Sequence, residues 1–396
     1  AILPHTKRVY FLEDGEMAVV EDHTIHITNA RTGARIKPRV QKLTWSVAQA
    51  EKGKYPFYML KEIHEQPAAL EQIAATSLPY TKRIAQAIKK SYGAYLVGCG
   101  SAAYACIAGE YLFSKIARRH VNVAIGSEFG YHLDFLTPKS ALLAVSQSGE
   151  TMDVLEGVKK AKEKNATIMA LVNVVGSTLY RIADDRIPIG VGPEKGVAST
   201  KALTGMIAHL ILLSYALDGR GSEGVAALKH ASEATRALLS TPMIKKVVDL
   251  VRVLKNYNHI YVIGRGLSYP TSLETALKIK EISYIHAEGM AAGELKHGTL
   301  ALVEKGTPCI VFLPNDETYG ASLAGAMEMK ARGGKIIGIS HKPHEIFDEY
   351  IPVRDTGVAT IIPNIVVGQL LGYYLAIERG FDPDKPRNLA KSVTVK

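Results

Sequence analysis

A cluster of hydroxyl side chains directly follows a short apolar run over residues 141–145. The run ends in a hexapeptide with the sequence Ser146-Gln147-Ser148-Gly149-Glu150-Thr151. Residues 152–164 then carry apolar side chains at the spacing of one helix face. Because the positive end of a helix dipole and free backbone N–H groups lie at such a strand-to-helix turn, the segment predicts a phosphate site. The same residues would also suit an ordinary helix N-cap.

A second group of reactive side chains lies later in the chain. Glu274, Lys278 and Glu281 fall on one face of a helix predicted over residues 272–285, and His297 follows in a glycine-bracketed loop. A carboxylate can move a proton between adjacent carbons of an open-chain sugar, and a histidine can open the ring, so these residues suit aldose–ketose chemistry. The plainer interpretation is an exposed Glu–Lys pair beside a structural histidine.

The sequence gives no sign of a metal or cofactor site. Cys99, Cys106 and Cys309 have neither metal-ligand spacing nor the pattern of a disulfide framework. The turns at residues 98–101 and 264–268 contain Gly-x-Gly but do not complete a dinucleotide fingerprint. We therefore expect no bound metal and no nicotinamide cofactor.

The elements that must position these residues occur twice in the chain. Gly98 and Gly264 are 166 residues apart and begin similar turns, and Thr151 and Thr318 end matching segments 167 residues apart. Both copies alternate short apolar runs, glycine-rich turns and helical patterns, which predicts parallel sheets with helices on both faces. The second copy has Asn315 and acidic residues where the first has serines, so only the first copy is expected to bind phosphate.

Composition limits the classes of function. The chain of 396 residues has 47% hydrophobic and 22% charged residues, as ordinary globular proteins do. The net charge of +10 suits anionic substrates, but the basic residues are spread along the chain, which does not favour nucleic-acid binding. Because no apolar run approaches about 18 residues and no leader is apparent, we expect a cytoplasmic protein without a membrane span.

The same patterns predict the organisation of the chain. A β-rich segment over residues 1–40 precedes a linker over 41–70, which contains Trp45. The first α/β domain is predicted at 71–240 and the second at 241–377, and an irregular tail at 378–396 is expected to lie over a site.

Five segments together resemble the glutamine–fructose-6-phosphate aminotransferase family, namely residues 146–151, 196–201, 280–283, 293–298 and 387–395. The resemblance covers nearly the whole chain and concerns the isomerase portion of that family. It implies two tandem, doubly wound sugar isomerase (SIS) domains of α/β fold, preceded by strands that look like the end of a glutaminase domain. The implied activity is conversion of fructose 6-phosphate, with ammonia, to glucosamine 6-phosphate, without a cofactor.

The resemblance also implies roles for individual residues. Glu281 would move the proton between C1 and C2 of the sugar, supported by Glu274 and Lys278. His297 would open the ring from the neighbouring subunit of a homodimer, and Lys391 would reach the open sugar and form a Schiff base with its ketone. Contacts to the sugar phosphate are implied for a further set, namely Ser101, Ser146, Gln147, Ser148, Thr151, Val197, Ser199 and Ala390.

The chain also departs from the family pattern. The family's glutaminase uses an N-terminal cysteine, whereas this sequence starts with Ala1 and its first cysteine is Cys99. Glutamine hydrolysis is therefore not expected, and ammonia would come from a missing glutaminase domain. Ala102 replaces a serine that would bind phosphate, so that contact is lost or moves to Ser101, at a cost of about 1.5–3 kcal/mol if lost. Thr299 and Lys396 also differ from the usual residues, for reasons the sequence does not explain.

Two alternatives remain on sequence grounds. A sugar-phosphate-sensing module would bind the ester without turning it over, and would leave Glu281, His297 and Lys391 without a role. A related isomerase or deaminase of another amino-sugar phosphate would share the loops, but the β-rich N-terminus and the tail at residues 387–395 speak against it.

Overall fold

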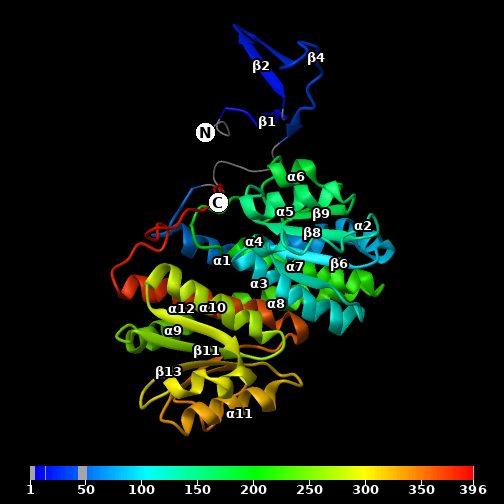
Figure 1. Cartoon of the computed structure of the whole chain (residues 1–396). Helices are drawn as coiled ribbons and strands as arrows, with labels where there is room; N and C mark the ends of the chain where they lie inside the picture. Colours follow the sequence, from blue (N-terminus) through cyan, green and yellow to red (C-terminus); the bar gives the residue numbers. More distant parts are fainter. Residues whose placement is uncertain (1–4, 14, 43–50, 396) are drawn as a thin grey trace. The chain divides into compact units, whose positions relative to one another are not determined.

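The computed structural model describes residues 5–13, 15–42 and 51–395 (Figure 1). The chain divides into two compact units, residues 1–53 and residues 54–396. Trp45 and most of the first half of the predicted linker lie outside the described residues.

The smaller unit consists of short antiparallel strands. Strands β2 (Glu16–Glu21), β3 (Thr24–Asn29) and β4 (Arg35–Ile36) form one sheet, and β1 (Arg8–Val9) pairs with β5 (Gln41–Lys42). A turn that includes residues 32 and 33 connects β3 to β4. Apolar side chains of β2 and β3 remain largely exposed, which is what a short meander without a core of its own would show.

The first sheet of the larger unit is entirely parallel. Its strands are β6 (Ala94–Gly98), β7 (Asn122–Ile125), β8 (Ala141–Ser146), β9 (Thr167–Val172) and β10 (Asp185–Pro188), in the order β10-β9-β8-β6-β7. Because helices cover both faces, the central strands read as continuous apolar runs rather than alternating ones. The strand order reverses between β6 and β8, and the carboxyl ends of these two strands are where such sheets open a crevice for ligands.

The second sheet repeats this topology. Its strands are β11 (His259–Gly264), β12 (His286–Ala291), β13 (Pro308–Leu313), β14 (Lys335–Ser340) and β15 (Glu349–Pro352), in the order β12-β11-β13-β14-β15. Each strand of the first sheet thus has a counterpart in the same place in the second. The predicted duplication of a doubly wound parallel α/β domain is confirmed.

Helices surround and join the two sheets (Figure 1). They are α1 (Tyr58–Thr76), α2 (Leu78–Lys90), α3 (Ser101–Leu112), α4 (Gly126–Phe129), α5 (Met152–Glu163), α6 (Thr178–Ile182), α7 (Lys201–Leu217), α8 (Gly221–Leu238), α9 (Thr241–Leu254), α10 (Ser268–Ser283), α11 (Tyr319–Lys330) and α12 (Ile361–Glu378). Short helical turns are η2 (Phe113–Ala117, a π-turn) and the 3₁₀ turns η3 (Ala292–His297), η4 (Thr299–Leu302) and η5 (Gly357–Thr360).

Helix α1 differs from the sequence-based expectation for this part of the chain. Residues 58–70 were assigned to a linker, but they form the first part of a 19-residue helix that packs on α7 and α8. Its Met59, Ile63 and Leu70 are fully buried in the core. These residues are therefore part of the packed unit, because an amphipathic helix stabilises itself by burying its apolar face.

Helix α12 also corrects an expectation. Residues 357–378 are long and apolar enough to cross a membrane, although the sequence analysis found no run of that length. In the structure, however, 89% of its most apolar window is buried, and the helix packs against α10 and α9. A core helix of a large α/β unit passes the same test of length and composition, so the run is weak evidence for a membrane span.

His209 lies fully buried in α7 and makes two hydrogen bonds. Its Nδ1 is 2.7 Å from the carbonyl oxygen of Gly205, and its Nε2 is 3.0 Å from the hydroxyl of Ser77. A neutral imidazole satisfies both, donating from Nδ1 and accepting the Ser77 proton at Nε2. Burial lowers the pKa of His209 from 6.5 to about 4, so the folded chain holds this group neutral.

Because His209 is buried in its neutral form, we expect the folded chain to lose stability in acid. Between about pH 6.5 and pH 4 the unfolded chain binds a proton at His209 that the folded chain does not, so the free energy of unfolding falls as the pH falls. The contribution is roughly 3 kcal/mol over this window. Urea unfolding at pH 7 and pH 5 should show a smaller difference for His209→Gln than for the original chain. His230→Gln, on the exposed face of α8, should leave the difference unchanged; equal differences for His209→Gln would contradict the assignment.

Candidate functional site

The hydroxyl loop lies at the carboxyl end of β8 and leads into α5. The Ser146 hydroxyl accepts a hydrogen bond from the Gly149 N–H at 3.0 Å, and the Ser148 hydroxyl accepts one from the Glu150 N–H at 3.1 Å. The hydroxyls of Ser146 and Thr151 are 3.3 Å apart. Because the Ser148 oxygen accepts from the backbone, its hydroxyl proton remains available to donate to an anion, and the Ser146–Thr151 pair leaves one further hydroxyl proton available.

Gly149 and Glu150 shape this loop without entering the anion position. Gly149 has a φ of +70°, and a Cβ there would come within 2.1 Å of the Ser177 hydroxyl, so only glycine fits. The Glu150 carboxylate accepts a hydrogen bond from the Thr178 N–H at 2.7 Å and so turns toward the start of α6. The charge of Glu150 is thereby engaged away from the hydroxyls that would receive a phosphate.

In the matching turn of the second copy, an acidic side chain accepts the hydrogen bonds of the turn's own donors. The Asp316 carboxylate accepts hydrogen bonds from the N–H and the hydroxyl of Thr318, at 2.8 and 2.6 Å. These donors at the start of α11 are the ones that an anion would need, and a fixed carboxylate beside them repels a phosphate. The structure thus gives a physical reason for the expected asymmetry between the copies.

The acid–base residues of α10 are buried, which rules out the interpretation of an exposed Glu–Lys pair. The side chains of Glu274 and Lys278 are 1% and 0% exposed, and that of Glu281 is 21% exposed. The Lys278 ammonium contacts the Glu281 carboxylate and lies 3.4 Å from Glu274. Burial would lower the pKa of Lys278, but the two carboxylates outweigh it and raise this pKa above its ordinary value. Burial raises the pKa of Glu274 to about 7.

Ser101 connects this triad to the first sheet. Its hydroxyl, at the start of α3, donates to the Glu274 carboxylate at 3.1 Å. With its single proton engaged there, Ser101 must switch partner before it can donate to a phosphate. Ala102, where a hydroxyl was expected, offers no donor in its place.

One pocket brings most of the predicted residues together. It lies at the carboxyl ends of β6 and β8, where the strand order of the first sheet reverses, and it also reaches α10 and the C-terminal tail. The predicted residues that line it are Ser101, Ser146, Gln147, Ser148, Thr151, Val197, Ser199, Glu281, Ala390 and Lys391. Glu274 and Lys278 do not line it but touch residues that do. Side chains from both copies and the tail thus share one hollow.

The tail reaches the pocket because three contacts hold it. The Asp384 carboxylate accepts hydrogen bonds from the Tyr58 and Met59 N–H groups, both at 2.8 Å, and so caps the start of α1. Further along, the carbonyl oxygen of Val393 accepts a hydrogen bond from the Met152 N–H at 3.1 Å, at the start of α5. Between these points the Lys391 ammonium lies 2.6 Å from the Glu194 carboxylate.

Glu194 and its neighbour Glu62 were missed by the sequence analysis. Glu194 stands two residues before a segment that resembled the family, so its position was a weak signal. Glu62 gave none, because it lies in α1, which read as a linker. Its carboxylate accepts hydrogen bonds from the N–H groups of Lys195 and Gly196, more than 130 residues away in the chain.

His297 was predicted to be catalytic, but it does not line this pocket. It ends the turn η3, and its side chain is exposed. Neither His297 nor its loop lines the hollow that contains Glu281 and Lys391. Any part it takes in chemistry at this pocket would have to come from another copy of the chain.

Comparison with known proteins identifies the family. The SIS domain model matches residues 87–214 and again residues 253–370. The chain is 38% identical to the glutamine–fructose-6-phosphate aminotransferase [isomerizing] of Caldanaerobacter subterraneus subsp. tengcongensis, over all of this chain and 68% of that protein. The chain belongs to the glutamine–fructose-6-phosphate aminotransferase family. The enzyme of the same name from Thermococcus kodakarensis is also 38% identical, over all of this chain and 67% of that protein.

A solved structure shows which portion of the family is represented. The C-terminal domain of the glucosamine-fructose-6-phosphate aminotransferase from Francisella tularensis superposes with a TM-score of 0.77 and 34% identity. The match covers 85% of this chain and 100% of that one. The two segments that match the SIS domain model include every strand of both parallel sheets.

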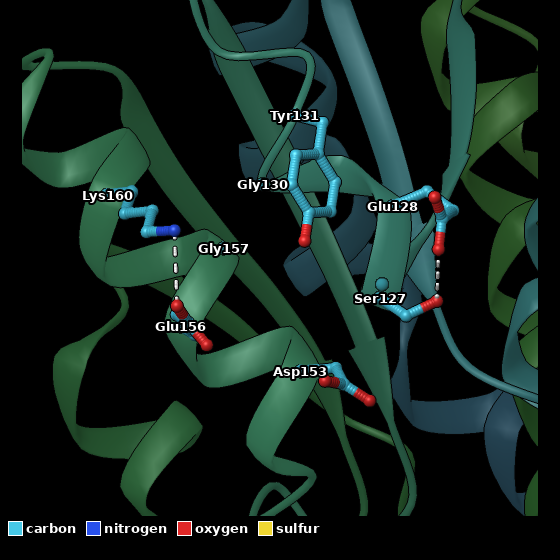
Figure 2. A pocket seen from close by; sticks show the side chains of 9 residues that line it. Ser127, Glu128, Gly130, Tyr131, Asp153, Glu156, Gly157 and Lys160 are labelled. Atoms are coloured by element: carbon cyan, nitrogen blue, oxygen red, sulfur yellow. Dashed lines mark hydrogen bonds and ion pairs between the residues drawn. The ribbon is translucent and has the colours of Figure 1, made fainter. Parts of the chain in front are cut away.

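A second hollow of this aminotransferase-family chain contains none of the predicted site residues. It lies between α4 and α5, and Figure 2 shows Lys160 and Glu156 pointing toward one another on one side and Glu128 turned toward Ser127 on the other. Lys160 pairs with Glu156 at 3.1 Å, and the Ser127 hydroxyl donates to Glu128 at 3.1 Å. With Asp153 also present, the hollow is acidic and suits a sugar phosphate less than the hydroxyl-lined pocket does.

Among the described residues, no group of histidine, cysteine and carboxylate side chains is arranged to hold a metal.

Proposed function

We propose that this chain performs the sugar isomerase step of its family, converting fructose 6-phosphate and ammonia to glucosamine 6-phosphate. The observation that carries the proposal is that Glu281, from the second α/β domain, lines the same pocket as the hydroxyl loop of the first α/β domain. The pocket offers donors for a phosphate and a carboxylate that can carry a proton. A hexose 6-phosphate has its ester and its reacting carbons at opposite ends.

The proposed roles follow from this arrangement. The hydroxyls of Ser146, Ser148 and Thr151 and the start of α5 bind the ester and fix the orientation of the sugar. Lys391 forms an imine at the C2 ketone, and ammonia then displaces the lysine, so that nitrogen stays on C2. Glu281 removes a proton from C1 and returns it to C2, while the C1 hydroxyl loses its proton to become the aldehyde oxygen and the imine nitrogen gains one to become the amine. The Lys278 ammonium contacts the Glu281 carboxylate and holds this side chain in place for the transfer.

None of the described residues that line the pocket has a proposed role in opening the sugar ring. We propose that His297 performs it from the neighbouring subunit of a homodimer, because its side chain is exposed and lies outside the pocket of its own chain. Sedimentation of His297→Ala should show the same dimer as the original chain, with slower turnover of the cyclic sugar. A monomeric original chain would contradict this part of the proposal.

We also propose that the protein acts in the cytoplasm.

The test is direct. The chain is incubated with fructose 6-phosphate labelled with ¹³C at C1 and C2, with and without ammonium, and the sugars are followed by NMR. Glucosamine 6-phosphate should form only when ammonium is present. Binding of the ester without any conversion would instead identify a sugar-phosphate-sensing module, and formation of another ketose or aldose phosphate would identify a related isomerase.

Removing two hydroxyls of the loop should weaken binding of the phosphate ester. For Ser148→Ala combined with Thr151→Ala we expect the dissociation constant for fructose 6-phosphate to rise at least tenfold. Each hydrogen bond to a charged group is worth about 1.5–3 kcal/mol, and tenfold corresponds to about 1.4 kcal/mol. Titration calorimetry measures this, with Ser222→Ala on the exposed side of α8 as the control. An unchanged dissociation constant would count against the loop as the phosphate site.

A further inference from the structure

The Lys391 side chain is fixed by a carboxylate that the sequence did not reveal. Its ammonium lies 2.6 Å from Oε2 of Glu194, whose side chain is 0% exposed, while Lys391 itself is 24% exposed. Lys391 lines the pocket, and Glu194 does not. The lysine thus has its charged end at the pocket wall and its counter-ion behind that wall.

Glu194 is itself held firmly in place. Its Oε1 accepts hydrogen bonds from the N–H groups of Thr200 and Ala202, at 2.9 and 3.0 Å, at the start of α7. The Thr200 hydroxyl donates a further one at 3.2 Å. Burial would raise the pKa of Glu194, but Lys391 and these donors outweigh it and hold that pKa below its ordinary value. Glu194 is therefore a buried anion whose position the helix end fixes.

A second carboxyl group lies behind the first. Glu62 of α1 is 2% exposed, its Oε1 accepts from the Lys195 and Gly196 N–H groups, and its Oε2 has no hydrogen-bond partner. Burial and then the charge of Glu194 raise the pKa of Glu62 to about 8. Burial and the Glu194 charge thus both favour the neutral form of Glu62.

The other cations near this pair have contacts of their own. The Glu65 carboxylate of α1 lies 2.6 Å from both the Lys61 and the Lys201 ammonium groups. The Lys195 ammonium lies over the Tyr58 ring instead. Within the described part of the chain, Lys391 is thus the cation recorded in contact with Glu194.

We propose that Glu194 is the positioning residue of Lys391: it holds the ammonium at the pocket wall and takes its proton when the amine adds to the sugar carbonyl. The inference rests on the proposed function and names a residue that this function requires. One ammonium proton moves to the Glu194 carboxylate, and the nitrogen lone pair forms a bond to C2. The carbonyl oxygen takes up two protons, one from the nitrogen after addition and one returned by Glu194, and leaves as water, which gives the protonated imine.

Two reactions of Lys391 should respond in opposite directions to Glu194→Gln. Borohydride trapping of the fructose 6-phosphate adduct, without ammonia, should slow at least thirtyfold, because the amine is no longer held against the substrate. Reductive methylation of Lys391 by formaldehyde, a small reagent that needs no such alignment, should be at least as fast as before, because the ammonium has lost its counter-ion. Mass spectrometry of peptides measures both, with exposed Lys280 as the internal reference.

Further variants separate positioning from general damage. Glu194→Asp keeps the anion and should restore trapping to within about tenfold of the original chain. Glu71→Gln, which alters an exposed carboxylate of α1 paired with Arg236, should change neither reaction. Binding of glucitol 6-phosphate, which has the ester but no carbonyl, should stay within threefold in all of them.

The outcomes that overturn the inference are distinct from failure of the proposed function. Trapping in Glu194→Gln within threefold of the original chain means that Glu194 does not position Lys391. Slowing of both reactions together, or loss of glucitol 6-phosphate binding, means that Glu194 only maintains the fold. An original chain that forms neither adduct nor product refutes the proposed function instead, and the methylation experiment still tests whether Glu194 holds Lys391.

Discussion

Glu281→Gln is expected to lower the rate of fructose 6-phosphate conversion by about 10³-fold, within the range that a general base contributes. The amide has the shape of the carboxylate but cannot accept the C1 proton. Because the ester would be held by the hydroxyl loop and not by Glu281, binding of fructose 6-phosphate should remain within threefold. NMR of the sugars gives the rate, and titration calorimetry gives the dissociation constant.

The control for this variant is Glu223→Gln, an exposed carboxylate at the start of α8 that pairs with Arg220. It should keep both the rate and the affinity of the original chain. Full activity of Glu281→Gln would remove Glu281 from the mechanism. Exchange of the C1 proton with solvent at an unchanged rate in this variant would mean that another group carries the proton.

Lys278→Met is expected to destabilise the folded chain by about 3–5 kcal/mol. The substitution removes a fully buried ammonium and leaves Glu274 and Glu281 facing each other without a cation. Uncompensated charge in the interior is costly, since burial alone already raises the pKa of Glu274 to about 7. Urea unfolding at pH 7 measures the effect as a fall in the free energy of unfolding.

Combining Lys278→Met with Glu274→Gln should recover part of the lost stability, because one of the two unpaired charges is removed. As a control, Lys245→Met breaks an exposed pair with Asp249 on α9 and should change stability by less than about 1 kcal/mol. A loss below about 1 kcal/mol for Lys278→Met would mean that the triad is far better hydrated than its burial indicates.

The duplicated fold could be predicted because its signals are local and occur twice. Gly98 and Gly264 each precede a helix that packs so closely that a Cβ would collide with its backbone, which requires glycine at both places. The hydroxyl loop was also predictable, since one strand-to-helix turn contains its residues from Ser146 to Thr151. Chain proximity alone brings these groups together, and the β8–α5 turn then fixes them.

The α10 triad shows the limit of such reasoning. The spacing of Glu274, Lys278 and Glu281 predicts one helix face but not which way that face points. An exposed pair and a buried catalytic triad have the same sequence pattern. The packing of α10 against α3 and α12 places the face inside the molecule. Burial there raises the pKa of Glu274, whereas the two carboxylates beside Lys278 outweigh burial and raise the pKa of Lys278.

The amino-acid sequence by itself determined the repeated parallel sheets, the hydroxyl loop and the family to which the chain belongs. Only the tertiary structure decided that Glu281, the loop and Lys391 share one pocket, and that Glu194 with Glu62 behind it holds the lysine. The reason is physical: sequence patterns encode neighbours along one element, whereas Glu62, Glu194 and Lys391 meet only after α1, the start of α7 and the tail have packed. Burial and the neighbouring charges at that meeting place shift the pKa values of Glu62 and Glu194, and no spacing along the chain carries that information.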